Sequence, residues 1–200
     1  VQLVAFPILI VNRSVEVSLN AIPLRTDDFS WDFTVIFSKN TSKVLELPDG
    51  VEAIQLGRFQ GGVSINAVKG QPYGVIFGTD YTYNANGDRL VDEDGYYIKT
   101  ATSNNVIGDV NPDWIGGFSN TFTYKSWAFN FLIDVQQGGS LFSLDQYYGE
   151  NTGLYVNTAY INDLGNPVRN PLSEGGGFIN QGVVNTGTAE NPVYVQNTTR

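Results

Sequence analysis

The stretch that decides the fold is FSWDFTVIFS, residues 29–38, in which large apolar side chains alternate with polar ones. Every odd position is Phe, Trp or Val, and every even position is polar except Ile36. Successive side chains of a β-strand point to opposite faces of its sheet. The period of two therefore predicts a strand with one apolar face and one polar face.

Three more segments repeat this pattern. The apolar side chains occupy odd positions in VEVSLNA, residues 15–21, and in WAFNFLIDVQ, residues 127–136. They occupy even positions in WIGGFSNTFTY, residues 114–124, where Gly116 and Asn120 interrupt the series. The spacing predicts four amphipathic strands, with apolar side chains on the odd positions of the first, second and fourth and on the even positions of the third.

The connections between these segments are short at one end and long at the other. Residues 23–28 and 125–126 predict tight turns, and so two antiparallel hairpins. The long connection from the second segment to the third carries weaker strand signals at 63–68, 73–83 and 96–98, with a turn at 84–88 closing a small hairpin between the last two. After residue 138 the chain is rich in Gly, Asn and Pro; we expect only a short helix at 140–148, with Ser140 as its N-cap.

This layout predicts an all-β, antiparallel transmembrane β-barrel with short periplasmic turns and long extracellular loops. Strands of about ten residues suit a tilted membrane crossing. Aromatic residues at the strand ends suit the two membrane interfaces; they are Phe29, Trp31, Trp114, Tyr124 and Trp127. Four strands cannot close a barrel, because single-chain barrels need roughly eight or more. The prediction therefore includes that the chain is a fragment of a longer one. The alternative is a soluble or surface β-sandwich that binds carbohydrate through its loops.

Composition excludes several classes of function. The chain has 200 residues with a formal charge of −9, which disfavours nucleic-acid binding because phosphate contacts need clustered cations. It contains no Cys, His or Met, so zinc sites built on Cys or His and Ser-His-Asp catalysis are excluded. No apolar run reaches the length of a transmembrane helix. We expect no cofactor and no enzyme activity.

The same segments resemble the C-terminal barrel region of the SusC/RagA family of TonB-linked outer-membrane proteins. Each matching motif is short, but their order and spacing across residues 13–169 make the combination specific. The motifs are VEVSLNA at 15–21, DFSWD at 28–32, FSKN at 37–40, GQPYG at 70–74, GDVNPDWIGG at 108–117, DVQQGG at 134–139 and LGNPVR at 164–169.

The resemblance implies a 22-stranded TonB-dependent receptor barrel in the outer membrane, crossed many times by the chain and closed inside by an N-terminal plug. Such receptors import glycans, oligosaccharides or peptides, are energised by TonB through the plug, and carry a SusD-like lipoprotein lid. Residues 1–200 then form part of one barrel domain. Its divisions are strand hairpins at 13–40 and 114–137 and long extracellular loops at 41–113 and 138–200. The function belongs to the parent receptor, because the plug and the closing strand are absent here.

Candidate ligand contacts are the loop tyrosines Tyr147, Tyr148 and Tyr155, whose rings could stack on sugars. The alternative, packing of the loop against the rest of the barrel rim, is favoured. Asp32 and Asp134 lie on polar strand faces and could line a wet lumen. A glycan-cleaving enzyme would need two such carboxylates about 5–9 Å apart, and no spacing in the sequence brings them together.

Two acidic segments resemble metal loops but favour turns. Residues 84–88 and 92–95 lack the regular alternation of oxygen ligands that an EF-hand calcium site requires, so hairpin turns are favoured. Residues 109–114 combine Asn-Pro-Asp with Trp114, which is typical of a turn followed by an interfacial anchor. No metal site and no catalytic residue is predicted.

Overall fold

The computed structural model describes residues 8–200, which form two compact units. The predicted domain also includes residues 1–7, which lie outside the described part. The first unit comprises the chain up to Arg58 with Ser64–Phe77 and Val106–Leu141, and the second comprises Phe59–Val63, Gly78–Asn105 and Phe142–Arg200.

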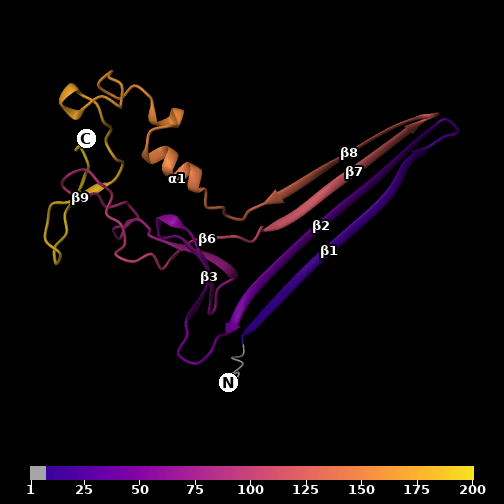
Figure 1. Cartoon of the computed structure of the whole chain (residues 1–200), viewed down its shortest axis with the longest axis horizontal. Helices are drawn as coiled ribbons and strands as arrows, with labels where there is room; N and C mark the ends of the chain where they lie inside the picture. Colours follow the sequence, from indigo (N-terminus) through magenta and orange to yellow (C-terminus); the bar gives the residue numbers. More distant parts are fainter. Residues whose placement is uncertain (1–7) are drawn as a thin grey trace. The chain divides into compact units, whose positions relative to one another are not determined.

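The first unit is built on a sheet of four long antiparallel strands in the order β1-β2-β7-β8 (Figure 1). Their bounds are β1 Leu9–Arg25, β2 Phe29–Glu46, β7 Trp114–Tyr124 and β8 Trp127–Gln137. The two hairpin turns lie at the same end, because Phe29 pairs with Tyr124. The sheet is open and not closed into a barrel; β1 and β8 are its edges within residues 8–200.

The first hairpin is longer than predicted. The turn expected at 23–28 is shorter, since β1 continues to Arg25 through a β-bulge between Ala21 and Leu24. A bulge inserts one extra residue, which here puts Leu24 opposite Trp31. The other end of the hairpin extends to Leu9 and Glu46, so the segment expected to be a loop from residue 41 begins inside β2.

The pairing register puts the apolar positions of all four strands on one face, as predicted. In one cross-strand row, Leu19 pairs with Val35, Val35 with Phe118, and Phe118 with Ile133. Because side chains alternate between faces, the same parity holds along each strand, except beyond the bulge in β1. Gly116 and Asn120 belong to this face too, opposite Phe37 and Phe33.

A second four-stranded sheet has the order β3-β4-β5-β6. Its strands are β3 Ala53–Arg58, β4 Ser64–Val68, β5 Tyr73–Gly78 and β6 Asn105–Asp109. A small core of Val44, Leu47 and Ala67 joins it to the end of β2. The backbone N–H of Val44 donates to the carbonyl of Gln71 at 2.9 Å. Sequence patterning located β4 and the start of β5 but missed β3 and β6.

The second unit is mostly turns and short elements. These are the 3-10 turns Gln60–Gly62, Val156–Thr158 and Leu172–Glu174, helix α1 Leu144–Asn151, and strands β9 Val183–Asn185 and β10 Tyr194–Gln196. The helix lies later than expected, and its N-cap is Ser143 instead of Ser140. The Ser143 side chain accepts a hydrogen bond from the Gln146 backbone N–H, which satisfies a donor left free in the first turn.

The two acidic segments form turns, as predicted. Asn84 Oδ1 accepts from the backbone N–H groups of Asn86 and Asp88, both at 2.9 Å. Asp92 Oδ1 likewise accepts hydrogen bonds from the backbone N–H groups of Asp94 and Tyr96. The hairpin expected between 73–83 and 96–98 is present, because Tyr81 pairs with Lys99 and the Thr82 backbone N–H donates to the Ile98 carbonyl. Its connection contains two turns instead of one, since Tyr83 also pairs with Arg89 and Val91 with Tyr97.

Candidate functional site

The apolar face of the β1-β2-β7-β8 sheet is uncovered. Trp127 is 78% exposed, Phe129 63% and Leu19 56%, although all three are large apolar side chains. No second sheet lies over these residues in the part of the chain that the structure describes, as it would in a β-sandwich. A large exposed apolar surface marks contact with a membrane or another protein.

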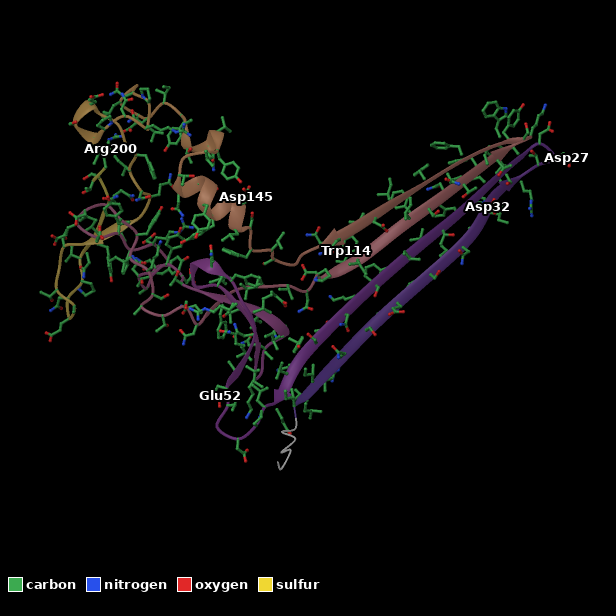
Figure 2. All side chains as sticks on the ribbon, viewed as in Figure 1. Asp27, Asp32, Glu52, Trp114, Asp145 and Arg200 are labelled. Atoms are coloured by element: carbon green, nitrogen blue, oxygen red, sulfur yellow. The ribbon has the colours of Figure 1, made fainter. Side chains whose placement is uncertain are left out.

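The height of this face fits a lipid bilayer. From the Phe29 row to the Lys39 row a strand rises about 33 Å, which becomes about 25 Å at the tilt of barrel strands and equals the apolar band of such barrels. Aromatic side chains bound it at both ends. Tyr124 and Trp127 pair beside the turns, and the Trp114 ring lies 5.9 Å from that of Phe37 at the far end (Figure 2).

One polar side chain interrupts the apolar face and is covered by a neighbour. Asn120 is only 5% exposed. Its Oδ1 accepts a hydrogen bond of 3.0 Å from the Trp31 indole Nε1. The Trp31 ring also stacks on Phe122 at 5.7 Å, which holds the indole across the strand. The sequence pattern predicted Trp31 at a membrane interface. In the structure its ring also covers the side-chain amide of Asn120.

The opposite face is polar and carries the two candidate carboxylates. Asp32 pairs with Thr121, whereas Asp134 pairs with Gly117, which in turn faces Ile36. Ile36 stands four residues from Asp32, roughly 13 Å along β2, so the carboxylates are not brought together. Near Asp134 the face is hollowed by about 500 Å³, with Glu16, Ile36 and Gln136 among its lining residues.

No metal or cofactor site emerges in the described residues. Between residues 8 and 200, no three Asp or Glu side chains cluster in a way that could hold a metal ion. None of the helices described is long and apolar enough to cross a membrane.

The structure places the three candidate tyrosines on and beside α1. Tyr147 and Tyr148 have ring centroids 5.3 Å apart. The Tyr148 hydroxyl donates to Gln60 Oε1 at 2.8 Å, and the Tyr155 hydroxyl donates to Asp145. The first contact joins α1 to the other long loop and the second lies within the final loop, yet Tyr147 and Tyr148 stay nearly half exposed. A ligand role for them remains a prediction.

The contact with Asp145 also changes the chemistry of Tyr155. The hydrogen bond to the carboxylate raises the pKa of Tyr155 above its ordinary value, with desolvation as a smaller cause. The phenol therefore stays neutral and donates. A cavity of about 400 Å³ opens beside it, lined by Ser143, Gln146, Glu150, Tyr155, Val156 and Asn157. The hydroxyl and amide groups of this lining, together with the Glu150 carboxylate, can form hydrogen bonds with polar ligand groups.

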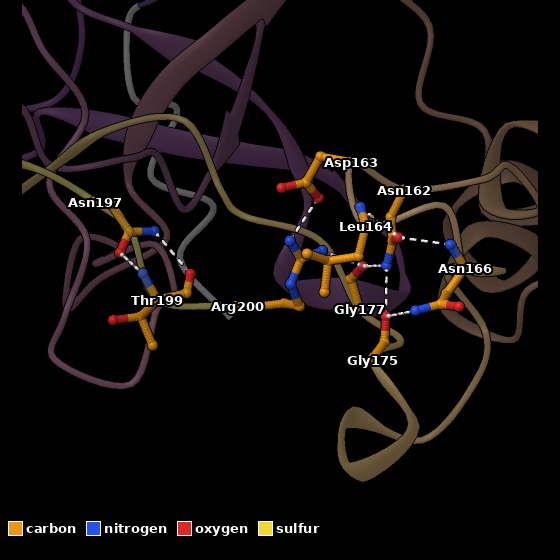
Figure 3. Close-up of polar contacts among 9 residues, drawn as sticks. All are labelled: Asn162, Asp163, Leu164, Asn166, Gly175, Gly177, Asn197, Thr199 and Arg200. Atoms are coloured by element: carbon orange, nitrogen blue, oxygen red, sulfur yellow. Dashed lines mark hydrogen bonds and ion pairs between the residues drawn. The ribbon is translucent and has the colours of Figure 1, made fainter.

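Two groups of side-chain hydrogen bonds hold the loop after α1 together. The Arg169 guanidinium donates to the carbonyls of Gly153 and Thr158. Asn162 is buried with every hydrogen-bonding position used: Oδ1 accepts from Leu164 and Asn166, and Nδ2 donates to Gly175 and Gly177 (Figure 3). In the same network Arg200 pairs with Asp163 at 2.5 Å, and this contact lowers the pKa of the Asp163 carboxyl.

Comparison with known proteins gives a consistent set of relatives. No protein-family model matches the chain. TonB-dependent receptor P26 of Formosa agariphila is 30% identical over 92% of this chain and 20% of its own length. TonB-dependent receptor P3 of the same organism is 28% identical over 65% of this chain and 15% of its own length. The chain thus spans about a fifth or less of these relatives.

Solved structures give the fold. The RagAB peptide transporter matches with a TM-score of 0.51 and 19% identity, over 70% of this chain and 16% of that one. The RagAB peptide importer in its closed-closed state matches with a TM-score of 0.50 and 18% identity. The antiparallel sheets of the chain therefore match part of the fold of the RagAB transporter.

The chain belongs to the TonB-dependent receptor family. The family consists of outer-membrane receptors and not of enzymes, which confirms the prediction that the chain is no enzyme.

Proposed function

We propose that the four long strands are a membrane-spanning section of a TonB-dependent transporter in the outer membrane. The observation that carries this proposal is the uncovered apolar face, about 25 Å high and bounded by aromatics, which matches the lipid-facing band of barrels. Backbone groups cannot remain unpaired in hydrocarbon. The free edges of β1 and β8 therefore pair with further strands of a 22-stranded barrel to which residues 1–200 belong.

The orientation follows from the connections. Barrels of this kind have short periplasmic turns and longer extracellular loops. The turns after β1 and β7 then face the periplasm, and residues 41–113 and 138–200 lie outside, with the polar face lining the lumen. The paired hairpins are two of the many membrane crossings.

The whole receptor would import a nutrient in an energy-dependent step. TonB would act through a plug, and a SusD-like lipoprotein, corresponding to RagB of the RagAB complex, would cover the mouth. The likeness to a peptide transporter supports a peptide cargo, and an oligosaccharide or glycan is the second candidate. Tyr147, Tyr148 and Tyr155 are proposed ligand contacts, because Tyr155 lines a cavity in this loop and the side chains of Tyr147 and Tyr148 on α1 are nearly half exposed.

The test compares two neighbouring positions in the full-length receptor. Phe131 belongs to the apolar face and lies close to mid-height, whereas Asn130 belongs to the polar face. Phe131→Arg should destabilise the receptor in a bilayer by roughly 2–4 kcal/mol, as charged residues at the lipid midplane do. Asn130→Arg should be tolerated. Folded fractions after refolding into lipid vesicles, read by heat-modifiable migration, measure both variants. Equal tolerance would overturn the assignment of faces.

A further inference from the structure

Three cations stand on the outward face, in the last row of the apolar band and just beyond it. Lys39 continues the odd positions of β2 after Phe37 and pairs with Val15. Arg13 pairs with Thr41, and Lys43 pairs with Val11. All of these positions keep the parity of the apolar face, so Arg13, Lys39 and Lys43 lie on it at the end away from the turns.

The three cations are close enough to act together. Arg13 is diagonal to both Lys39 and Lys43 across the β1-β2 pair, and diagonal neighbours in a sheet are about 7–8 Å apart. Their side chains are exposed. The whole chain carries a net charge of −9, so general basicity does not explain this grouping.

No acidic side chain of residues 8–200 forms an ion pair with the group. The ion pairs within residues 8–200 join Lys125 to Asp28 and Arg200 to Asp163, and neither involves these cations. Glu16 lies on the opposite face. Glu46 pairs with Leu9 and therefore shares the face of the cations, one row beyond Lys43, but it forms no ion pair with Lys43. At the turn end of the sheet, by contrast, Lys125 is matched by Asp28. Adjacent like charges repel, so an external anion would stabilise the group.

We propose that Arg13, Lys39 and Lys43 form a binding surface for phosphorylated lipid headgroups in the leaflet on the long-loop side. The group is continuous with the apolar band, and Trp114 lies at the same level as Lys39, where aromatic side chains sit among headgroups. A lipid could then place its acyl chains along the apolar face and its phosphate between the cations. This inference rests on the proposed membrane-spanning barrel.

The experiment titrates phosphatidic acid and, separately, phosphatidylcholine into the full-length receptor in neutral detergent, with bound lipid counted by native mass spectrometry. The test variant is Arg13→Gln/Lys39→Gln/Lys43→Gln. The control, Arg58→Gln/Lys69→Gln/Lys99→Gln, removes the same charge from positions off this face. Each cation near a lipid surface contributes about fivefold in affinity, so the test variant should lose on the order of a hundredfold for phosphatidic acid. The control should bind as the parent does.

Unchanged affinity in the test variant would overturn the inference. So would binding of inorganic phosphate as tight as that of phosphatidic acid, because the site would then recognise a free anion and not a lipid. The Phe131→Arg and Asn130→Arg comparison, made in the same receptor, separates this failure from failure of the barrel assignment. A receptor that passes the facing test but shows no preference for phosphatidic acid rejects only the headgroup surface.

Discussion

The hydrogen bond between Trp31 and Asn120 lies in an apolar setting, because Asn120 stands between Phe33 and Phe131 in its cross-strand row. Trp31→Phe would leave the Asn120 carbonyl unpaired in an apolar setting, which costs about 1–3 kcal/mol. Adding Asn120→Leu should recover most of this loss, because no unsatisfied acceptor remains. A double-mutant cycle on the unfolding free energy of the full-length receptor measures the coupling. Additive effects of the two substitutions would contradict the proposed shielding.

Asp163 and Arg200 predict a pH dependence of the loop after α1. The pKa of Asp163 is lowered in the folded protein by the hydrogen bond from Arg200. The pair therefore stabilises the loop above the unfolded pKa of about 3.9, and this contribution is lost as the pH falls through the lower folded value. Hydrogen exchange across residues 160–200, corrected for intrinsic rates, should rise in that window. In the Asp163→Asn variant, residues 160–200 should exchange faster than in the parent at neutral pH. Lowering the pH through the window in which Asp163 is protonated should cause no further increase in this variant.

The sequence pattern identifies unusual single residues but does not predict which residues lie next to them. Asn120 was visible as an interruption of its strand pattern, but its partner stands 89 residues away in the chain. The cations were equally visible, since Lys39 and Lys43 continue the parity of Phe37. Their grouping with Arg13 depends on the register of β1 against β2, which a strand pattern alone does not specify.

At the scale of elements, the period of two predicted the strands, but it did not predict the residues at which the elements begin and end. Alternation located the cores of β1, β2, β7 and β8, because one face of each must be apolar. The bulge after Ala21 was missed: Pro23 favoured a turn, whereas the extra residue returns Leu24 to the apolar face. The helix was shifted by three residues, because Ser140 and Ser143 are equally good N-caps and only local packing selects between them.

Helix α1 offers a test of how the loop is held. A Cβ added at Gly149 would collide with the Tyr155 ring. Gly149→Ala should therefore displace Tyr155 and break its hydrogen bond to Asp145, even though Ala favours a helix by about 1 kcal/mol. Faster hydrogen exchange in residues 144–158 would report the displacement. Gly57→Ala, where the added Cβ meets nothing within 4 Å, is the matched control and should leave exchange unchanged.

At the scale of the whole molecule, the apolar face needs apolar surroundings and the free strand edges need hydrogen-bonding partners. Leu19, Phe129 and Trp127 remain more than half exposed within their unit. β1 and β8 present unpaired backbone groups along their outer sides in the described residues. Long exposed apolar edges template association with other chains. Lipid would cover the apolar face and neighbouring strands would pair the free edges, whereas water can form hydrogen bonds only with the backbone groups.

This argument predicts the behaviour of the 200-residue chain by itself. In plain buffer it should aggregate, and it should stay dispersed only in detergent, because no second sheet covers its apolar face. Size-exclusion chromatography with and without detergent, followed by denaturant unfolding, makes the measurement. A cooperative monomer in plain buffer would mean that the apolar side chains bury one another, and the carbohydrate-binding β-sandwich would replace the membrane-spanning section. Dependence on detergent would instead leave lipid as the partner that this face requires.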